Sequence, residues 1–322
     1  MKLGVKKEYG IFGDERFSII DWTLHPGKVV IGLIQSVISN MAKVGWKVGI
    51  LQLDGGGILG VLTLYILYTL STMGIKVMDR FKIFFTCSTG TIIGGLLQVW
   101  DVKKIFEWYV VKGPTAFKKN PFFGGFLWGT LYSPKEIEKL LRGVFGVMTL
   151  KQLHDKSGID WRIAIFDVDA EETIIINWES HPDWEVVEAI ICSMSAPIYF
   201  PDRKYKGKAW CDGGTGTHTC LAEEAYDHAV YDLKMDPSEF YLLSLGCGWA
   251  KTKGQGKSKL DMALWVFQVG RNESVRQQDE FFSDRQEEGV LFGDRWDPQM
   301  PSDLNEMDGT DNIDELISFM ER

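Results

Sequence analysis

Around Ser88, a buried strand, a tight turn and an apolar helix follow one another along the chain. An apolar run predicts the strand over residues 81–85, and a second run predicts a helix from about residue 92. The small residues between them read Thr86-Cys87-Ser88-Thr89-Gly90. This layout is typical of a nucleophile elbow, which lifts a serine hydroxyl to the end of a sheet, at a helix N-terminus. A serine that caps an ordinary strand–helix junction would leave the same pattern.

Strand and helix patterns alternate along most of the chain. Further strands are expected over residues 47–53, 161–167, 173–178 and 240–245. Helices are expected over residues 61–70, 134–145, 183–194 and 221–235. This alternation predicts a three-layer α/β fold, with a mostly parallel central sheet flanked by helices.

A further helix is expected before the first strand, within residues 1–45. Its apolar positions recur at helical spacing: Val30, Leu33, Ile34, Val37, Met41 and Val44. The helix is too short to cross a bilayer, and it suits packing within the fold or between two copies better than membrane anchoring.

Composition narrows the class of protein. The chain of 322 residues is 45% apolar and 25% charged, which is ordinary for a globular protein. No apolar run reaches about 18 residues, and the first residues lack the apolar core of a signal peptide. The five cysteines are widely spaced and form no C-x-x-C pair, so we expect a cytoplasmic protein without a disulfide framework or zinc site.

The net charge of −9 is unevenly distributed. Residues 271–322 hold 15 acidic and 5 basic side chains, which leaves the rest of the chain close to neutral. A nucleic-acid-binding protein usually carries a basic face, so no nucleic-acid partner is expected.

Residues 103–132 are rich in aromatic side chains and lysines. They suit a membrane–water boundary, where rings lie at headgroup depth and ammonium groups meet anionic lipid. The prolines and glycines in the run also suit a mobile lid. A core-packing segment with solvated lysines is the plainer interpretation.

A glycine-rich turn, Asp54-Gly-Gly-Gly-Ile-Leu-Gly60, joins the strand at 47–53 to the next helix. Its G-x-G-x-x-G spacing matches a dinucleotide-binding fingerprint. The same geometry builds an oxyanion hole, because glycine N–H groups at a helix start can donate to a developing alkoxide. A hydrolase also needs an exposed serine on a neighbouring strand, and Ser88 meets that need.

A serine nucleophile needs a base, and two residues are candidates. His218 lies in a glycine-rich turn, but histidines are otherwise absent from predicted strand ends. Asp212 begins Asp212-Gly-Gly, a turn that could bring a carboxylate close to the nucleophile. Burial at an apolar site would raise the pKa of Asp212 and make it a better base.

Taken together, the Asp54-Gly-Gly-Gly turn, the Ser88 elbow and Asp212-Gly-Gly resemble the patatin-like phospholipases. Two further segments are also similar to family motifs: Ser193-Met-Ser-Ala-Pro-Ile-Tyr-Phe-Pro201 and Leu243-Ser-Leu-Gly-Cys-Gly248. The similarity is good over residues 47–250 and looser over 260–320. It implies a patatin-like fold made of an N-terminal extension (1–45), a catalytic domain (46–250) and an acidic C-terminal helical segment that packs on it (251–322).

The resemblance implies a lipid acyl hydrolase with a Ser88–Asp212 dyad and no catalytic histidine. Ser88 would form an acyl-enzyme, Asp212 would act as general base, and the amides of Gly55, Gly56 and Gly57 would hold the oxyanion. Thr86 and Gly90 would support the elbow. No metal or cofactor is required. The expected partner is a phospholipid or lysophospholipid at the inner membrane surface.

Two positions and one short segment depart from the family pattern. Thr86 stands where glycine is usual, Leu59 where a basic residue is usual, and Gly216-Thr-His-Thr219 where Asn-Asn-Pro is usual. Two alternatives therefore stay open beside a constitutive hydrolase. One is a membrane-degrading effector of bacterial antiviral defence, switched on by a small-molecule activator or a partner; a homo-oligomer also stays open. The other is a catalytically weak scaffold that binds lipid.

Overall fold

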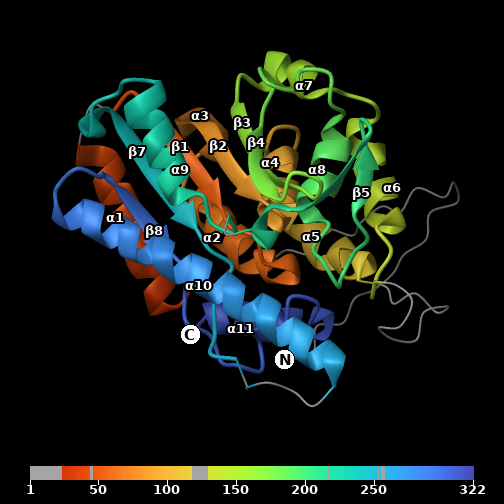
Figure 1. Cartoon of the computed structure of the whole chain (residues 1–322). Helices are drawn as coiled ribbons and strands as arrows, with labels where there is room; N and C mark the ends of the chain where they lie inside the picture. The colour runs from red at the N-terminus through yellow and green to blue at the C-terminus, as the bar shows by residue number, and fades with distance from the viewer. Residues whose placement is uncertain (1–23, 44–45, 118–129, 217, 253, 255–257) are drawn as a thin grey trace, which may run out of the picture.

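The computed structural model describes residues 24–43, 46–117, 130–216, 218–252, 254 and 258–322. Its centre is one sheet with helices on both faces (Figure 1). The described residues form eight strands, in the order β5-β6-β3-β2-β1-β7-β8 with β4 beside β3. Their bounds are β1 Val48–Leu53, β2 Phe81–Cys87, β3 Asp160–Asp167, β4 Glu172–Ile176, β5 Arg203–Tyr205, β6 Lys208–Asp212, β7 Phe240–Leu245 and β8 Gly293–Trp296.

The sheet is mostly parallel. Strands β3, β2, β1, β7 and β8 are parallel to one another, whereas β4 and β6 pair antiparallel with β3, and β5 pairs antiparallel with β6. The central strands β1, β2 and β7 are buried almost throughout, as expected for strands covered on both faces. The predicted fold class is therefore confirmed.

Successive strand residues face two separate hydrophobic clusters, one on each side of the sheet. On β2, Phe84 packs into one cluster, whereas Phe85 and Cys87 pack into the other. On β7, Leu243 and Leu242 divide in the same way. This period of two is the signature of a strand between two helical layers.

Two helical layers cover the sheet. The larger layer contains α1 Lys28–Lys43, α2 Gly60–Thr72, α4 Thr89–Leu97, α5 Val102–Ala116, α6 Lys135–Phe145, α8 Val186–Met194 and α11 Ile313–Met320. Helix α9 (Ala222–Asp227) and the second half of α10 (Lys259–Glu287) cover the other face. Short helices α3 Val77–Arg80 and α7 Leu150–Ser157 complete the described set. Figure 1 shows α10 as the long blue helix that crosses the molecule.

The helix expected near the N-terminus is α1, and the prediction that it packs within the fold is confirmed. Val30, Ile34 and Val37 are buried in the core. Ser36 and Asn40 hydrogen-bond to Asp294 of β8, with the Asn40 Nδ2–Asp294 Oδ2 distance at 2.9 Å. Val44, the last position of the predicted stripe, lies outside the described residues.

The segment predicted as an acidic helical tail contributes more than helices. Strand β8 extends the central sheet beyond β7, with Leu242 opposite Gly293 and Leu245 opposite Trp296. Helix α10 leads into this strand. The division expected at residue 250 therefore falls between two strands of one sheet.

The aromatic run at 103–132 is core over its described part. Phe106, Trp108 and Tyr109 of α5 are buried, as is Tyr132. Phe117 is half-buried against the same core. Phe122, Phe123, Phe126 and Trp128, on which the lid and membrane-face interpretations also depend, lie outside the described residues.

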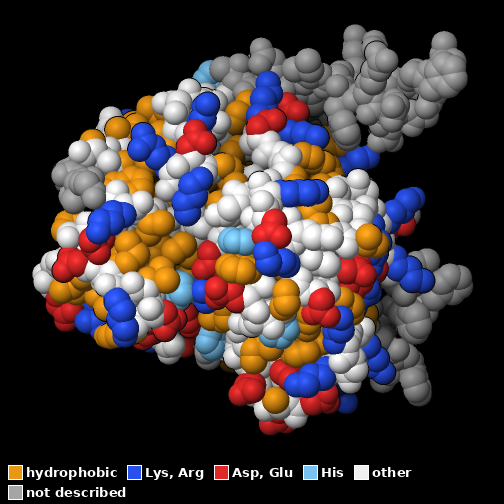
Figure 2. Space-filling model, turned by 90° about the horizontal axis from the view of Figure 1, so that it is seen from above, with side chains coloured by type: hydrophobic (Ala, Val, Ile, Leu, Met, Phe, Trp, Pro, Cys, Tyr) orange, Lys and Arg blue, Asp and Glu red, His pale blue; other side chains and the backbone are white. Residues whose placement is uncertain are grey.

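No helix in the described part of the chain is long and apolar enough to cross a membrane. Figure 2 shows the face at the top of Figure 1, where side chains of both charge signs are interspersed with apolar ones. All five cysteines are buried and free, so no disulfide joins them.

Candidate active site

Ser88 lies at the turn between β2 and α4, as the sequence predicts. Its φ is 51° and its ψ is −121°, a conformation that costs energy for any residue other than glycine. The Ser88 N–H donates to Ser193 Oγ at 3.0 Å, and Ser193 Oγ donates to the carbonyl of Ala164 at 2.8 Å. The strained turn is thus tied to the neighbouring strand β3, which is the arrangement of a nucleophile elbow.

The other predicted elbow residues, Gly90 and Thr86, pack tightly around this turn. A Cβ at Gly90 would lie 2.3 Å from the carbonyl oxygen of Leu53, so only glycine lets α4 approach β1 this closely. The Thr86 hydroxyl accepts a hydrogen bond from Trp161 Nε1 at 2.9 Å.

Asp212 ends β6, where it lies opposite Ile165 of β3. Its N–H donates to the Ser195 carbonyl at 3.1 Å, and its Oδ1 accepts from the Gly214 N–H at 2.8 Å. A Cβ at Gly213 would lie 2.8 Å from the backbone of Ala164, so the turn after Asp212 requires glycine there. Burial raises the pKa of Asp212 to about 6, although Ser88, Gly214 and Cys87 act in the opposite direction.

The Ser88 hydroxyl is close enough to the Asp212 carboxylate to lower the pKa of that group. The two do not reach full hydrogen-bond geometry, so among the described residues Asp212 Oδ2 has no hydrogen-bond partner. Catalytic hydrogen bonds are often long until substrate binds. The structure therefore brings together the two residues of the predicted dyad and leaves one carboxylate oxygen available for a proton.

The three predicted oxyanion donors differ in what their N–H groups do. Gly55 donates to the Thr219 carbonyl at 2.9 Å, so its N–H is already engaged. This differs from the sequence prediction, because a spacing pattern does not show which amides the tertiary fold uses. Among the described residues, no acceptor is found for the N–H groups of Gly56 and Gly57. These two amides remain as candidate oxyanion donors.

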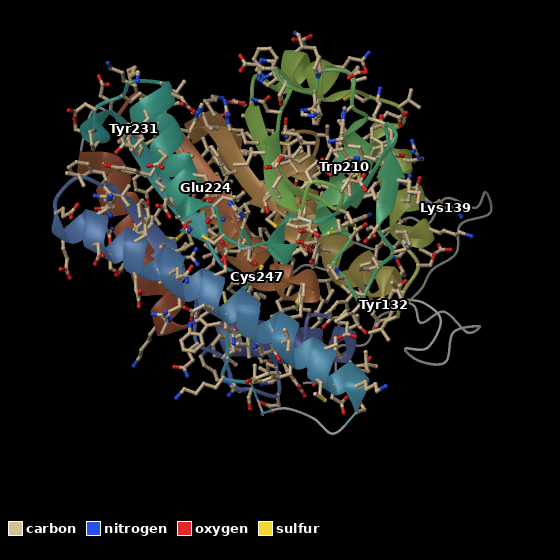
Figure 3. All side chains as sticks on the ribbon, in the orientation of Figure 1. Tyr132, Lys139, Trp210, Glu224, Tyr231 and Cys247 are labelled. Carbon is tan, nitrogen blue, oxygen red and sulfur yellow. The ribbon has the colours of Figure 1, made fainter. Side chains whose placement is uncertain are left out.

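Close packing explains why this turn is made of glycine. A Cβ at Gly55 would lie 3.0 Å from Ser88 Cβ. A Cβ at Gly56 would lie 2.4 Å from Cys247 Cβ, and Figure 3 shows Cys247 near the centre of the molecule, where β7 ends. Gly57 has a φ of 60°, and a Cβ there would lie 2.2 Å from the Met307 carbonyl oxygen.

An apolar pocket opens beside Ser88. Its wall includes Gly57 from the glycine turn and Met307 from the C-terminal segment. The rest is mostly aliphatic and aromatic: Ile58, Thr89, Ile92, Trp108, Tyr109, Gly113, Phe117, Ile137, Met194, Ala196, Tyr199 and Phe200. Among the described residues no charged side chain lines it, so an apolar wall lies next to the hydroxyl of the candidate nucleophile.

Tyr109 joins the glycine turn to the elbow helix. Its hydroxyl donates to the Gly57 carbonyl at 2.6 Å and lies 2.5 Å from Thr89 Oγ1. Thr89 is the residue after Ser88. One phenol group therefore fixes the distance between the candidate oxyanion donors and the nucleophile.

Comparison with known proteins decides the family. The model of the patatin-like phospholipase family matches residues 51–225, which is more than half of the chain. This protein belongs to the patatin-like phospholipase family.

Among its relatives are two patatins of Solanum tuberosum. Patatin group M-3 is 27% identical over 275 residues, covering 72% of this chain and 69% of the relative. Patatin-15 is also 27% identical, over 258 residues that cover 67% of this chain and 64% of the relative. The chain thus matches about two thirds of each patatin.

Solved structures overlap more loosely. VipD from Legionella pneumophila aligns with a TM-score of 0.41 at 14% identity, over 85% of this chain and 67% of VipD. ExoU in its complex with SpcU, from the type III secretion system of Pseudomonas aeruginosa, aligns with a TM-score of 0.37 at 14% identity. That alignment covers 73% of this chain and 53% of the solved one.

This member of the patatin-like phospholipase family departs from the usual motifs at sites where the fold makes room for the change. The extra bulk of Thr86 lies over Gly94 of α4, where an added Cβ would meet Thr86 Cγ2 at 2.8 Å. Leu59 is completely buried in the core, so no charge is presented there. Thr219 lies in the segment that replaces the usual Asn-Asn-Pro, and its carbonyl accepts a hydrogen bond from the Gly55 N–H.

The alternative base, His218, pairs with a different acid. Its Nε2 lies 3.2 Å from Glu224 Oε1, and burial lowers the pKa of His218. Burial also raises the pKa of Glu224 to about 7. The contacts of His218 therefore do not assign it to the patatin-like dyad.

Several residues of this patatin-like site were not predicted from the sequence: Cys87, Tyr109, Ser193 and Met307. The sequence indicates two of them weakly, because Tyr109 lies in the aromatic run and Cys87 adjoins the nucleophile. Ser193 falls in a family-like motif. Nothing in the sequence indicates Met307, because its place in the pocket wall depends on how the C-terminal segment packs against the glycine turn. In the described part of the chain, no cluster of histidine, cysteine and acidic side chains could hold a metal ion.

Proposed function

We propose that this member of the patatin-like phospholipase family is a lipid acyl hydrolase of the phospholipase A or lysophospholipase type. The observation that carries the proposal is the strained Ser88, which lies on the wall of an apolar pocket beside a buried Asp212. An esterase for lipids needs a nucleophile, a base and space for an acyl chain at one point. Ser88 would supply the nucleophile and Asp212 the base, and the apolar wall would give the acyl chain a surface to lie against.

In the proposed first step, Ser88 Oγ attacks the ester carbonyl carbon while its proton passes to Asp212 Oδ2. The carbonyl oxygen becomes an alkoxide, which the N–H groups of Gly56 and Gly57 stabilise. The carbon–oxygen bond to the glycerol side then breaks, and the leaving alkoxide takes the proton from Asp212. The acyl chain stays on Ser88 and lies against the apolar wall beside it.

The second step reverses these proton transfers. Water attacks the acyl-enzyme carbonyl and gives its proton to Asp212. The new tetrahedral intermediate collapses, Ser88 Oγ leaves and regains the proton, and a fatty acid is released. A pKa of about 6 suits this role, because Asp212 is ionised near neutral pH but still basic. The substrate would be drawn from a membrane surface.

The test is hydrolysis of a short-chain chromogenic ester and of phosphatidylcholine vesicles. We expect turnover by the wild type, and loss of at least about 10³-fold in Ser88→Ala and Asp212→Asn. Ser157→Ala and Asp160→Asn are matched controls, because Ser157 ends α7 and Asp160 begins β3, at the opposite end of that strand from the residues that pair with β6. Turnover that survives Ser88→Ala in folded protein would overturn the proposal.

A further inference from the structure

Cys87, the residue before the nucleophile, contacts the base. Its Sγ donates to Asp212 Oδ1 at 3.6 Å. Both side chains are buried, and the thiol lies on the sheet face covered by α9 and α10. The neighbour that supports Ser88 through the backbone thus also contacts Asp212 through its side chain.

The hydrogen bonds of the Asp212 carboxylate are divided unevenly between its two oxygens. Oδ1 accepts from both the Gly214 N–H, at 2.8 Å, and the Cys87 thiol. Among the described residues Oδ2 accepts none. Two donors on one oxygen fix the rotation of the carboxylate about its own axis, and the other oxygen is left free to take a proton.

We propose that Cys87 is a positioning residue, whose thiol holds Asp212 Oδ1 so that Oδ2 stays turned towards Ser88. This inference rests on the proposed function, since it gives Asp212 the role of base. It adds a role for the residue between Thr86 and Ser88, which the dyad mechanism itself does not use.

The thiol is a donor over the whole pH range in which Asp212 titrates. Burial, and then the negative charge of Asp212, raise the pKa of Cys87 well above that of an ordinary thiol. Cys87 therefore stays protonated and cannot compete with Ser88 as a nucleophile. A thiol is also a weak donor, so it orients the carboxylate and lowers the basicity of Asp212 only slightly.

Few other groups shift the pKa of Asp212 or of Cys87. The pKa of Asp212 responds to burial, Ser88, the Gly214 N–H and Cys87. The negative charge of Asp54, in the glycine turn, contributes to the raised pKa of Cys87. The charge of Asp212 likewise contributes to the raised pKa of the neighbouring Cys211 thiol. A change in the pH profile on substitution of Cys87 therefore reports the Cys87–Asp212 contact directly.

The experiment is the pH dependence of kcat/KM for ester hydrolysis by Cys87→Ala, Cys87→Val and Cys87→Ser. The first two variants remove the donor, and valine also keeps the side chain's bulk. We expect their acid limb to move upward by about half a pH unit and kcat to fall roughly 3- to 10-fold. Cys87→Ser keeps a donor, so its limb should lie closer to that of the wild type. Cys192→Ala, a buried cysteine on α8, is the packing control and should leave the limb unmoved.

An acid limb that stays at the wild-type position in both Cys87→Ala and Cys87→Val would overturn the proposal, even if activity fell. That result would make Cys87 a packing residue. Failure of the proposed function is distinguishable, because then the wild type itself would show no hydrolysis that depends on Ser88. Circular dichroism and thermal melting confirm that each variant is folded before its profile is compared.

Discussion

The guanidinium of Arg295 and the carboxylate of Asp54 form a buried, two-point ion pair. The Nη2–Oδ2 distance is 3.1 Å and the Nη1–Oδ1 distance is 3.3 Å. The Arg295 side chain is 5% exposed and that of Asp54 is 0% exposed. Arg295 belongs to β8, whereas Asp54 begins the glycine turn, so the pair fixes the candidate oxyanion loop to the far end of the sequence.

Substitution of Arg295 by methionine is expected to destabilise the fold. Asp54 would remain buried without its cation, which typically costs about 3–5 kcal/mol. Urea denaturation measures this loss. Arg276→Met is the control, because Arg276 is exposed and pairs with Glu273 and Glu280 on the surface of α10, so no measurable change is expected. Equal stability of the Arg295 variant and the wild type would show that the ion pair does not hold the loop.

Replacing Asp212 by asparagine should abolish activity and yet stabilise the protein at neutral pH. The pKa of Asp212 is raised to about 6 in the folded state, whereas an unfolded aspartate titrates near 4. The folded state therefore binds the proton more tightly, and ionisation costs stability as pH rises from about 4 to about 6. Above that window the cost is complete.

We expect Asp212→Asn to exceed the wild type by about 1–3 kcal/mol in urea denaturation at pH 8, with little difference at pH 4. A variant that is less stable than the wild type at pH 8 would contradict the pKa assignment. So would a difference that is the same at both pH values.

Tyr109→Phe tests the link between the two halves of the site. The ring would remain in the pocket wall, but the hydroxyl that joins Gly57 to Thr89 would be lost. We expect kcat to fall roughly 10-fold with little change in KM, because the donors shift relative to the nucleophile. Tyr226→Phe, on the other face of the sheet, is the control. A change confined to KM would indicate that Tyr109 serves only as pocket lining.

The fit of Thr86 over Gly94 predicts a coupled pair of substitutions. Gly94→Ala should lower both stability and activity, because its Cβ would meet Thr86 Cγ2 at 2.8 Å. Thr86→Ser removes that methyl group and keeps the hydroxyl that Trp161 binds. The double variant should therefore recover about 1 kcal/mol relative to the sum of the single effects. Strict additivity in a double-mutant cycle would rule out the contact as the cause.

The local parts of the site could be predicted from the sequence, and the tertiary parts could not. Ser88 and the glycine turn each follow a strongly apolar strand, so their place at a sheet end could be inferred. Strands β5 and β8 have only three and four residues and contain charged side chains, so they leave no apolar pattern. Helix α10 lies inside the C-terminal segment expected to be helical, but its bounds were not predicted for a related reason: its buried positions include Arg271, Ser274 and Gln278, which blur the apolar periodicity.

The contacts that hold the site also depend on distant parts of the chain. Arg295 reaches Asp54 across 241 positions, and Cys87 reaches Asp212 across 125. No local pattern signals such pairs. The Asp212-Gly-Gly turn was predicted from its composition and its resemblance to the family, whereas the short strand β6 that places it was not.

Covalent labelling with a fluorophosphonate tests the central claim most directly, because it needs the nucleophile and its base but no particular lipid. Intact-mass measurement and peptide mapping would follow the wild type, Ser88→Ala and Asp212→Asn over time. The dyad predicts one adduct on Ser88 in the wild type, none in Ser88→Ala and labelling slowed at least about 10²-fold in Asp212→Asn. An adduct on another residue, or a wild-type rate in folded Asp212→Asn, would contradict the account.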